Sequence, residues 1–153
     1  MELIVVLNNV TSVQRLLDFS RVALTSGEVK YLVLTKVGGT AAQAGVPEVH
    51  KQAFRSSKGL LVLPELRDAI EILSPEAVYM ISSTGKNELN GEELLRAKRV
   101  MVVFSGVEPG FSKLEESLGL HVKLPGVNDD IGPSSLLSVF LYCTLRRFDL
   151  KGG

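Results

Sequence analysis

Glycine and small hydroxyl side chains collect directly behind several apolar segments of this sequence. The groups in this position include Ser82-Ser83-Thr84, Ser105-Gly106 and Pro125-Gly126. Glycine lets a backbone approach a ligand closely, although loops also use glycine, proline and serine for turns alone. Ligands of open parallel sheets bind beyond the carboxyl ends of the strands. If the apolar segments are parallel strands, these groups predict a small-molecule site at one edge of the sheet.

These glycines match neither of the common phosphate-binding fingerprints. Gly38-Gly39 lacks the spacing and the lysine of a P-loop, and no G-x-G-x-x-G run follows the first apolar segment. A nucleoside triphosphatase or a dinucleotide-dependent enzyme is therefore not expected.

The residues that commonly bind metals are few and scattered. Cys143 is the only cysteine, which excludes an internal disulfide and a multi-cysteine metal site. His50 and His121 are far apart in the sequence and are expected to be ordinary surface or helix-end residues. Asp129-Asp130 lie in a loop rich in glycine and proline, where carboxylates are usually solvated. No metal site is expected.

Length and composition describe one folded domain without a dominant charge. The chain has 153 residues, 45% of them hydrophobic, and we expect one domain over residues 1–150 with a tail at 151–153. Seventeen Lys and Arg balance seventeen Asp and Glu, so contact with nucleic acid must depend on a local patch. The most apolar runs are far shorter than the roughly 20 residues of a membrane-spanning helix. We expect a cytoplasmic protein that does not bind membranes.

The apolar segments and the stretches between them alternate in type. Short apolar runs predict six strands, at Leu3–Leu7, Tyr31–Leu34, Gly59–Leu63, Ala77–Ile81, Val100–Phe104 and Leu120–Leu124. Helical patterns lie between or after them, at Ser12–Thr25, Pro47–Arg55, Glu65–Leu73, Glu92–Ala97, Phe111–Ser117 and Ser134–Phe148. This alternation predicts an α/β fold with a mostly parallel six-stranded sheet and helices on both faces.

The last predicted helix, Ser134–Phe148, is apolar around nearly its whole surface. Such a helix must be buried in a thick core or against another subunit. In a chain of this size we expect the second, a homodimer in which Phe140 contributes to the contact between subunits.

Three stretches of the sequence resemble the motifs of the SPOUT superfamily of trefoil-knotted RNA methyltransferases. Asn9-Val10-Thr11-Ser12 running to Arg21-Val22-Ala23 resembles the first motif, and Phe104–Gly110 resembles the second. Leu124-Pro125-Gly126 through Ser134-Ser135-Leu136 resembles the third. The opening stretch and Thr35–Glu48 are similar to a small archaeal group of stand-alone SPOUT proteins, described both as RNA methylases and as RecB-like nucleases.

The resemblance implies a C-terminal trefoil knot, an S-adenosylmethionine site and an RNA substrate, either rRNA or tRNA. Leu124 and Ile131 would enclose the adenine, and a large side chain at Gly106 would fill the cleft rather than the core. The residues implied to bind the methyl donor are Ser82, Ser83, Thr84, Ser105, Gly106, Gly110, Leu124, Gly126, Ile131, Gly132 and Ser134.

The residues implied in catalysis are Arg21, Asn9 and Glu108. Arg21 would act on the substrate in the cleft of the partner subunit, or it is a surface arginine paired with Asp18. Glu108 would contact donor or substrate, or it is a solvated loop carboxylate.

The sequence also departs from the best-known branch of the superfamily. Arg15 and Leu17 stand where that branch has asparagine and glycine, and Leu136 or Leu137 replaces an asparagine of the last helix. One alternative is therefore a non-catalytic SPOUT dimer that binds RNA or protein. Another is a metal-dependent nuclease that uses Asp129-Asp130, although no lysine follows this pair closely.

Overall fold

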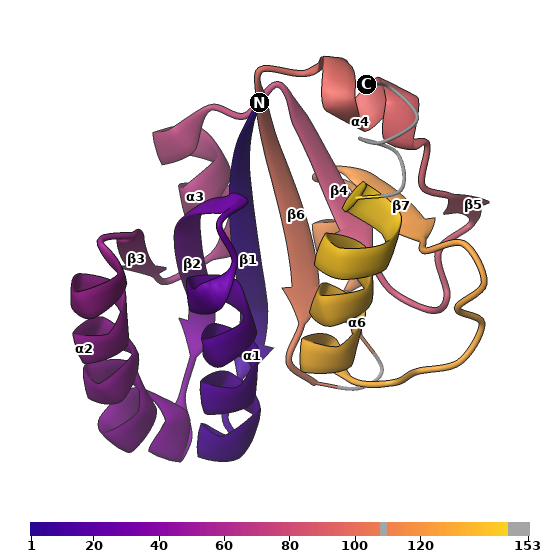
Figure 1. The fold of residues 1–153 in the computed structure, drawn as a ribbon. Helices are drawn as coiled ribbons and strands as arrows, with labels where there is room; N and C mark the ends of the chain where they lie inside the picture. Colours follow the sequence, from indigo (N-terminus) through magenta and orange to yellow (C-terminus); the bar gives the residue numbers. More distant parts are fainter. Residues whose placement is uncertain (108–109, 147–153) are drawn as a thin grey trace.

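A computed structural model describes residues 1–107 and 110–146 of the chain. In the described residues a seven-stranded sheet runs in the order β3-β2-β1-β6-β4-β7-β5, and every neighbouring pair is parallel (Figure 1). The strands are β1 Glu2–Val10, β2 Val29–Val37, β3 Gly59–Leu63, β4 Ala77–Ile81, β5 Asn87–Glu88, β6 Arg99–Ser105 and β7 Leu120–Lys123. The predicted α/β class with a parallel sheet is confirmed.

The predicted strand number is wrong by one, because the sequence pattern gave no sign of β5. This edge strand has two exposed polar residues, Asn87 and Glu88, which pair only with Val122 and Lys123 of β7. A strand this short has no apolar run, so periodicity cannot find it.

Helices cover both faces of the sheet, as predicted. Buried residues of α1, α2 and α6 form one core with the strands, and those of α3 form a second core on the opposite face (Figure 1). The helices are α1 Val13–Thr25, α2 Val46–Ser56, α3 Leu66–Leu73, α4 Gly91–Arg96, α5 Lys113–Glu116 and α6 Pro133–Val139. Two π-helical turns, η1 Ala41–Gly45 and η2 Phe140–Leu145, adjoin α2 and α6.

α1 begins at the carboxyl end of β1 and packs beside α6. Ser12 caps its first turn, where the Ser12 hydroxyl accepts a hydrogen bond from the Arg15 backbone N–H at 3.2 Å. Further along, Phe19 contacts Phe104 of β6 edge to face, with ring centroids 5.6 Å apart. The cap therefore fixes the start of α1 at the edge of the sheet where ligands are expected.

Most of the last helix is covered by its own chain. Phe140 is fully buried, with its ring 6.4 Å from that of Phe104. The prediction that Phe140 faces a second subunit is therefore wrong. The exposed side of this helix carries Tyr142, which is 51% exposed, and Cys143. The predicted residues 147 and 148 of the helix lie outside the described residues.

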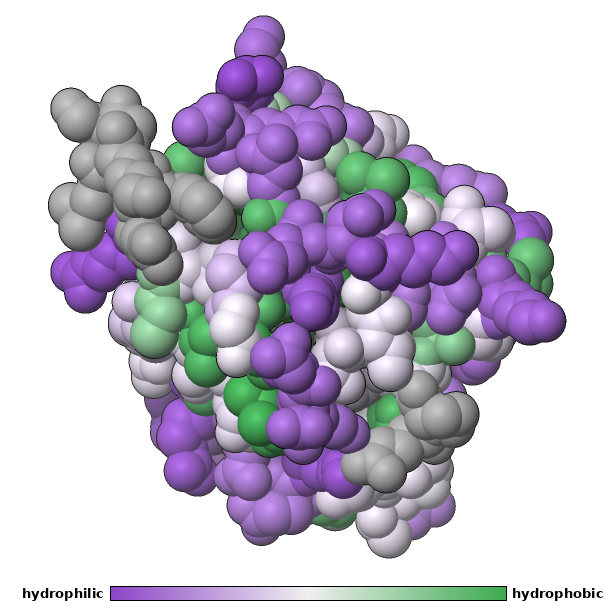
Figure 2. All heavy atoms as spheres, turned by 90° about the vertical axis from the view of Figure 1, so that its right-hand side faces the viewer, coloured by the Kyte–Doolittle hydropathy of each residue, from purple (hydrophilic) through white to green (hydrophobic). Residues whose placement is uncertain are grey.

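The surface at the β5 edge is mainly hydrophilic. Figure 2 shows this face, on which hydrophobic areas are small and separated by polar residues. No helix in residues 1–107 and 110–146 is long and apolar enough to cross a membrane.

Candidate functional site

A small cavity of about 50 Å³ lies at the carboxyl ends of β4 and β6, which are neighbours in the sheet. We call it the edge cleft. It is lined by Arg15, Ile81, Ser82, Ser83, Thr84, Ser105, Val107, Gly110, Asp130, Pro133 and Leu136. Five of these residues, Ser82, Ser83, Thr84, Ser105 and Gly110, were predicted to bind a cofactor. The structure thus brings together loops that are far apart in the sequence.

Arg15 lines the cleft, although from the sequence it stood out only because the best-known branch of the SPOUT superfamily has another residue at this position. Its Nη1 donates a hydrogen bond to the Gly106 carbonyl at 3.1 Å. Arg15 lies in the first turn of α1, directly beyond the carboxyl end of β1. A cationic side chain three residues after a helix cap was the available signal, because the first turn of a helix that follows a strand lies at this edge.

Arg21 lies farther from the edge cleft in the described chain. It lies six positions after Arg15, which is about 9 Å along the helix axis. Arg21 is exposed on α1 and does not line the cleft. Asp18, its expected partner, instead accepts a hydrogen bond from Gln14 at 2.8 Å.

Gly106 holds the ends of β1 and β6 close together. Its N–H donates to the Asn8 carbonyl at 2.9 Å. A Cβ at Gly106 would lie 2.7 Å from the Asn9 carbonyl oxygen and 2.8 Å from Val10 Cβ. The expectation that a large side chain here fills only the cleft is therefore wrong, because it would displace the end of β1. Asn9 itself is half-buried with a φ of 66°, an uncommon conformation for a residue other than glycine.

The loop between β7 and α6 contributes to the cleft through fewer residues than predicted. Leu124 is only 1% exposed and belongs to the core, whereas Ile131 is 42% exposed. The predicted adenine sandwich between these two side chains is therefore not formed in this structure. Gly132 has a φ of 84°, and its N–H donates to Asp130 Oδ1 at 2.9 Å.

Two further predicted cofactor residues, Gly126 and Ser134, do not line the cleft in this structure. Gly126 has a φ of 81°, in a turn closed by the hydrogen bond from the Val127 N–H to the Leu124 carbonyl. Ser134 lies half-buried in the first turn of α6. Glu108 lies outside the described residues.

A second polar group lies against the cleft and joins three elements. Ser82, at the end of β4, has its Oγ 2.5 Å from Nε2 of His121 in β7. His121 Nδ1 lies 3.5 Å from Glu116 Oε1 of α5. The edge of the Phe111 ring also contacts the His121 ring. The expectation that His121 is an ordinary surface residue is wrong, since its side chain is 11% exposed and contacts a cleft residue.

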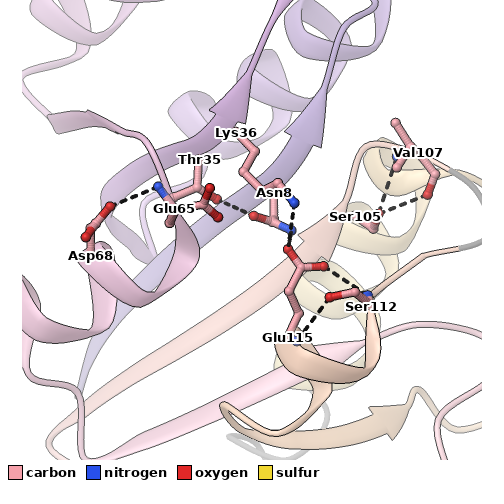
Figure 3. A network of polar contacts seen from close by, with 9 residues as sticks. All are labelled: Asn8, Thr35, Lys36, Glu65, Asp68, Ser105, Val107, Ser112 and Glu115. Atoms are coloured by element: carbon pink, nitrogen blue, oxygen red, sulfur yellow. Dashed lines mark hydrogen bonds and ion pairs between the residues drawn. The ribbon is translucent and has the colours of Figure 1, made fainter.

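A buried network joins β1, β2 and α5 on the side of the sheet that α3 covers (Figure 3). Asn8 Nδ2 donates to Glu115 Oε2 at 2.7 Å, and the Thr35 hydroxyl donates to Asn8 Oδ1 at 2.7 Å. Glu115 Oε1 accepts from the Ser112 N–H at 3.0 Å, and Lys36 Nζ lies 3.5 Å from Glu115 Oε2. Both oxygens of the Glu115 carboxylate thus have partners.

These contacts keep Glu115 ionised although it is only 7% exposed. Burial raises the pKa of Glu115, but the hydrogen bonds from Ser112 and Asn8 and the charge of Lys36 outweigh this effect. The pKa of the Glu115 carboxyl therefore lies below its ordinary value. The network ties α5, which follows β6 in the sequence, to the end of β1.

Metal-binding side chains do not cluster in the part of the chain that the structure describes. No group of three or more His, Cys, Asp or Glu residues in it could hold a metal ion. Asp130 lines the edge cleft, but its Oδ1 is used by the Gly132 N–H.

The fold is that of SpoU-type RNA methyltransferases. It matches the SpoU methyltransferase AviRb from Streptomyces viridochromogenes with a TM-score of 0.75 at 14% identity, over 98% of this chain and 61% of that chain. AviRb is also known in complex with the cofactor AdoMet, S-adenosylmethionine. A protein described in work on 2-OH methylation of C/U34 on tRNA matches with a TM-score of 0.73 at 17% identity, over 97% and 91% of the two chains. The chain spans about three fifths of AviRb.

Sequence relatives define the family more narrowly. Residues 39–143 match the family described as RecB-family nuclease (DUF2122), and the chain belongs to this family. A relative from Aeropyrum pernix, named as a candidate type II restriction enzyme (ApeKORF2002P), is 42% identical over 147 residues, which are 95% of this chain and 94% of the relative. The names of the structural neighbours and of the sequence relatives therefore refer to different chemistry.

Proposed function

We propose that the protein binds S-adenosylmethionine at the edge cleft and transfers its methyl group to RNA. The observation that carries this proposal is the convergence of the loops after β4, β6 and β7 with Arg15 on one cleft, in a fold shared with RNA methyltransferases. Backbone groups of residues 82–84, 105–107 and 126–132 would hold the donor. The sulfonium of the donor makes its methyl group electrophilic, so the protein has to position an acceptor and help remove its proton.

The cleft must widen for this donor. At about 50 Å³ it is far smaller than the roughly 300–1,000 Å³ of typical small-molecule sites. Gly126 and Gly132 have φ values of 81° and 84° in the loop that would have to move. Movement of this loop would also free Leu124 and bring Ile131 toward the adenine, as the sequence resemblance implies.

Arg15 and Arg21 have separate roles in this proposal. Arg15 lies at the donor cleft of its own chain, where its charge would orient the acceptor or a phosphate next to it. Arg21, on the exposed side of α1, would reach the cleft of a second subunit. Asn9 would shape the end of β1 from which the helix with both arginines begins. Glu108 would contact donor or substrate.

We further propose that the protein is a homodimer with a trefoil knot near its C-terminus. Tyr142 on the exposed side of the last helix supplies apolar area that suits a two-fold contact. The close packing of residues 82–89 on β7 supports the knot, since the Ser82 N–H donates to the Val122 carbonyl and the Leu89 N–H to the Lys123 carbonyl.

Calorimetry with S-adenosylhomocysteine tests donor binding. We expect binding in the micromolar range to the unmodified protein. Transfer of labelled methyl groups to a pool of unmodified tRNA and rRNA transcripts then tests the reaction. Binding without transfer would favour the non-catalytic alternative, and no binding at millimolar concentration would refute the proposal.

The family name supports one competing function, a metal-dependent nuclease. Such an enzyme needs carboxylates grouped around a divalent cation, and the described residues contain no such group. Magnesium-dependent cleavage of duplex DNA that is abolished by Asp129→Ala would establish this function instead.

A further inference from the structure

Ser82, His121 and Glu116 form a connected row that leads from the edge cleft to a second cavity. Ser82 lines the cleft, and its Oγ lies 2.5 Å from His121 Nε2. His121 and Glu116 line a separate cavity of about 440 Å³ beside β5 and β7. The Glu116 side chain is 38% exposed, so the outer end of the row reaches solvent.

The backbone fixes the positions of Ser82 and His121, two of the three residues of the row. His121 pairs with Met80 in the parallel register of β4 and β7, which places it next to the end of β4. The Ser82 N–H donates to the Val122 carbonyl at 3.1 Å, which holds the start of the loop against β7. Residues on paired strands keep their spacing better than residues on loops, so the contact between Ser82 and His121 does not depend on a flexible segment.

The charges around His121 determine the direction of its hydrogen bonds. An ionised carboxylate can only accept, so Glu116 at 3.5 Å favours the proton on His121 Nδ1. Nε2 of the neutral ring is then an acceptor, and the Ser82 hydroxyl donates to it. Ser82 Oγ in turn accepts from the Thr84 N–H at 3.2 Å. The ring also contacts Phe111 edge to face, and this neighbour carries no charge.

We propose that Ser82, His121 and Glu116 form a proton relay for methyl transfer to a hydroxyl acceptor, which rests on the proposed methyltransferase function. When the acceptor oxygen takes the methyl group, the bond from sulfur to methyl breaks and the oxygen–methyl bond forms. The acceptor proton moves to Ser82 Oγ, and the Ser82 proton moves to His121 Nε2. The positive charge lost by the sulfonium thus appears on His121, where Glu116 stabilises it. Ser82 is the catalytic residue, and His121 and Glu116 act through it.

The relay assigns the class of acceptor as well as the residues. An acceptor hydroxyl, such as a ribose hydroxyl, must lose its proton during methyl transfer and benefits from a nearby base. A base nitrogen with a free lone pair needs no such relay. The row therefore predicts that the methylated atom is one that loses a proton, and a ribose hydroxyl is the acceptor of this kind that we assign.

Steady-state kinetics with His121→Gln test the relay. Glutamine keeps a polar group of similar reach but cannot take up the proton. Because general-base catalysis contributes about 10²–10⁴-fold, we expect kcat to fall about 100-fold with His121→Gln and with Ser82→Ala. The KM for the donor and the affinity for S-adenosylhomocysteine should change less than about threefold. His50→Gln, on the exposed side of α2, is the matched control and should match the unmodified protein.

The chain has only two histidines, so nitrogen NMR of the rings provides a readout independent of turnover. His50→Gln leaves the signals of His121 alone, which should be those of the Nδ1–H tautomer. Glu116→Gln should shift the ring toward the Nε2–H tautomer, because the carboxylate no longer favours a proton on Nδ1.

The outcomes separate the relay from the proposed function. An unmodified protein that binds no S-adenosylhomocysteine overturns both. Donor binding and methyl transfer with an unchanged kcat in His121→Gln overturn the relay alone, as does methylation at a base nitrogen that carries no proton. If the donor binds but no transcript is methylated, an Nε2–H tautomer in the unmodified protein overturns the relay.

Discussion

Replacing Glu115 with alanine should cost the protein about 3 kcal/mol of unfolding free energy. The change removes the only acceptors of the Asn8 amide and the Ser112 N–H in the described structure. Asn8 is 1% exposed, and a buried donor without a partner costs about 1–3 kcal/mol. Loss of the capping box at Ser112 adds about 1 kcal/mol. At about 2–4 °C per kcal/mol for a chain of this size, the midpoint of thermal unfolding should fall by about 6–12 °C.

Glu115→Gln should lower the unfolding free energy less than Glu115→Ala, because the hydrogen bonds of the network can rearrange around glutamine. Glutamine presents one acceptor and one donor, and the donor would face the Asn8 amide nitrogen. The Asn8 amide can turn over, because the Thr35 hydroxyl accepts hydrogen bonds as readily as it donates them. Only the ion pair with Lys36 at 3.5 Å is then lost, and Lys36 is partly exposed, so we expect about 1 kcal/mol.

Urea unfolding at pH 7, followed by circular dichroism at one fixed protein concentration, measures both variants. Glu116→Gln is the control, because this neighbouring side chain is 38% exposed and should change stability by less than about 0.5 kcal/mol. A loss below about 1 kcal/mol in Glu115→Ala, or equal losses in the alanine and glutamine variants, would refute the interpretation of this network.

Three further predictions concern the cleft, the dimer and the loop on β7. Arg15→Ala and Arg21→Ala should each lower methyl transfer about 100-fold with little change in donor affinity, and mixing them should restore part of the activity if the site is shared. Tyr142→Asp should convert a dimer into a folded monomer in sedimentation; a monomeric unmodified protein would contradict this. Gly85→Ala should destabilise by about 1–3 kcal/mol, because a Cβ would overlap the backbone of β7, whereas Gly27→Ala meets no atom and should be neutral.

The sequence predicted the central strands well because their consecutive apolar residues are covered on both faces of the sheet. β1 and β6 are buried over most of their length, which is why consecutive apolar residues identified them. The pattern of apolar residues could not predict the order of the strands. β4 lies between β6 and β7, and this order depends on contacts between segments distant in sequence. For the same reason, the sequence could not place His121 beside Ser82.

The choice between two arginines illustrates a second limit. The motif resemblance selected Arg21, whereas the cleft of the described chain contains Arg15. Position along a helix distinguishes them: only the first turn of α1 lies at the carboxyl end of β1. The prediction that Phe140 contacts a second subunit was wrong for a related reason. The sequence of an apolar helix does not reveal which part of its surface is covered by the sheet of its own chain.

Two consecutive residues of α5 connect the candidate site to the rest of the fold. Neighbouring residues of a helix point about 100° apart, so Glu115 and Glu116 can serve different strands. Glu115 bonds to Asn8 at the end of β1, and Glu116 faces His121 of β7. Since β6 and β4 lie between these two strands, α5 spans the edge that carries the cleft.

The two carboxylates of α5 therefore predict a separation of effects, in which Glu115 variants change stability and its dependence on pH. The lowered pKa of Glu115 means that the folded protein binds fewer protons than the unfolded chain, so its contribution is complete above about pH 5 and is lost as pH falls through the folded pKa. Glu116 variants should instead change the rate of methyl transfer while the stability curve stays in place.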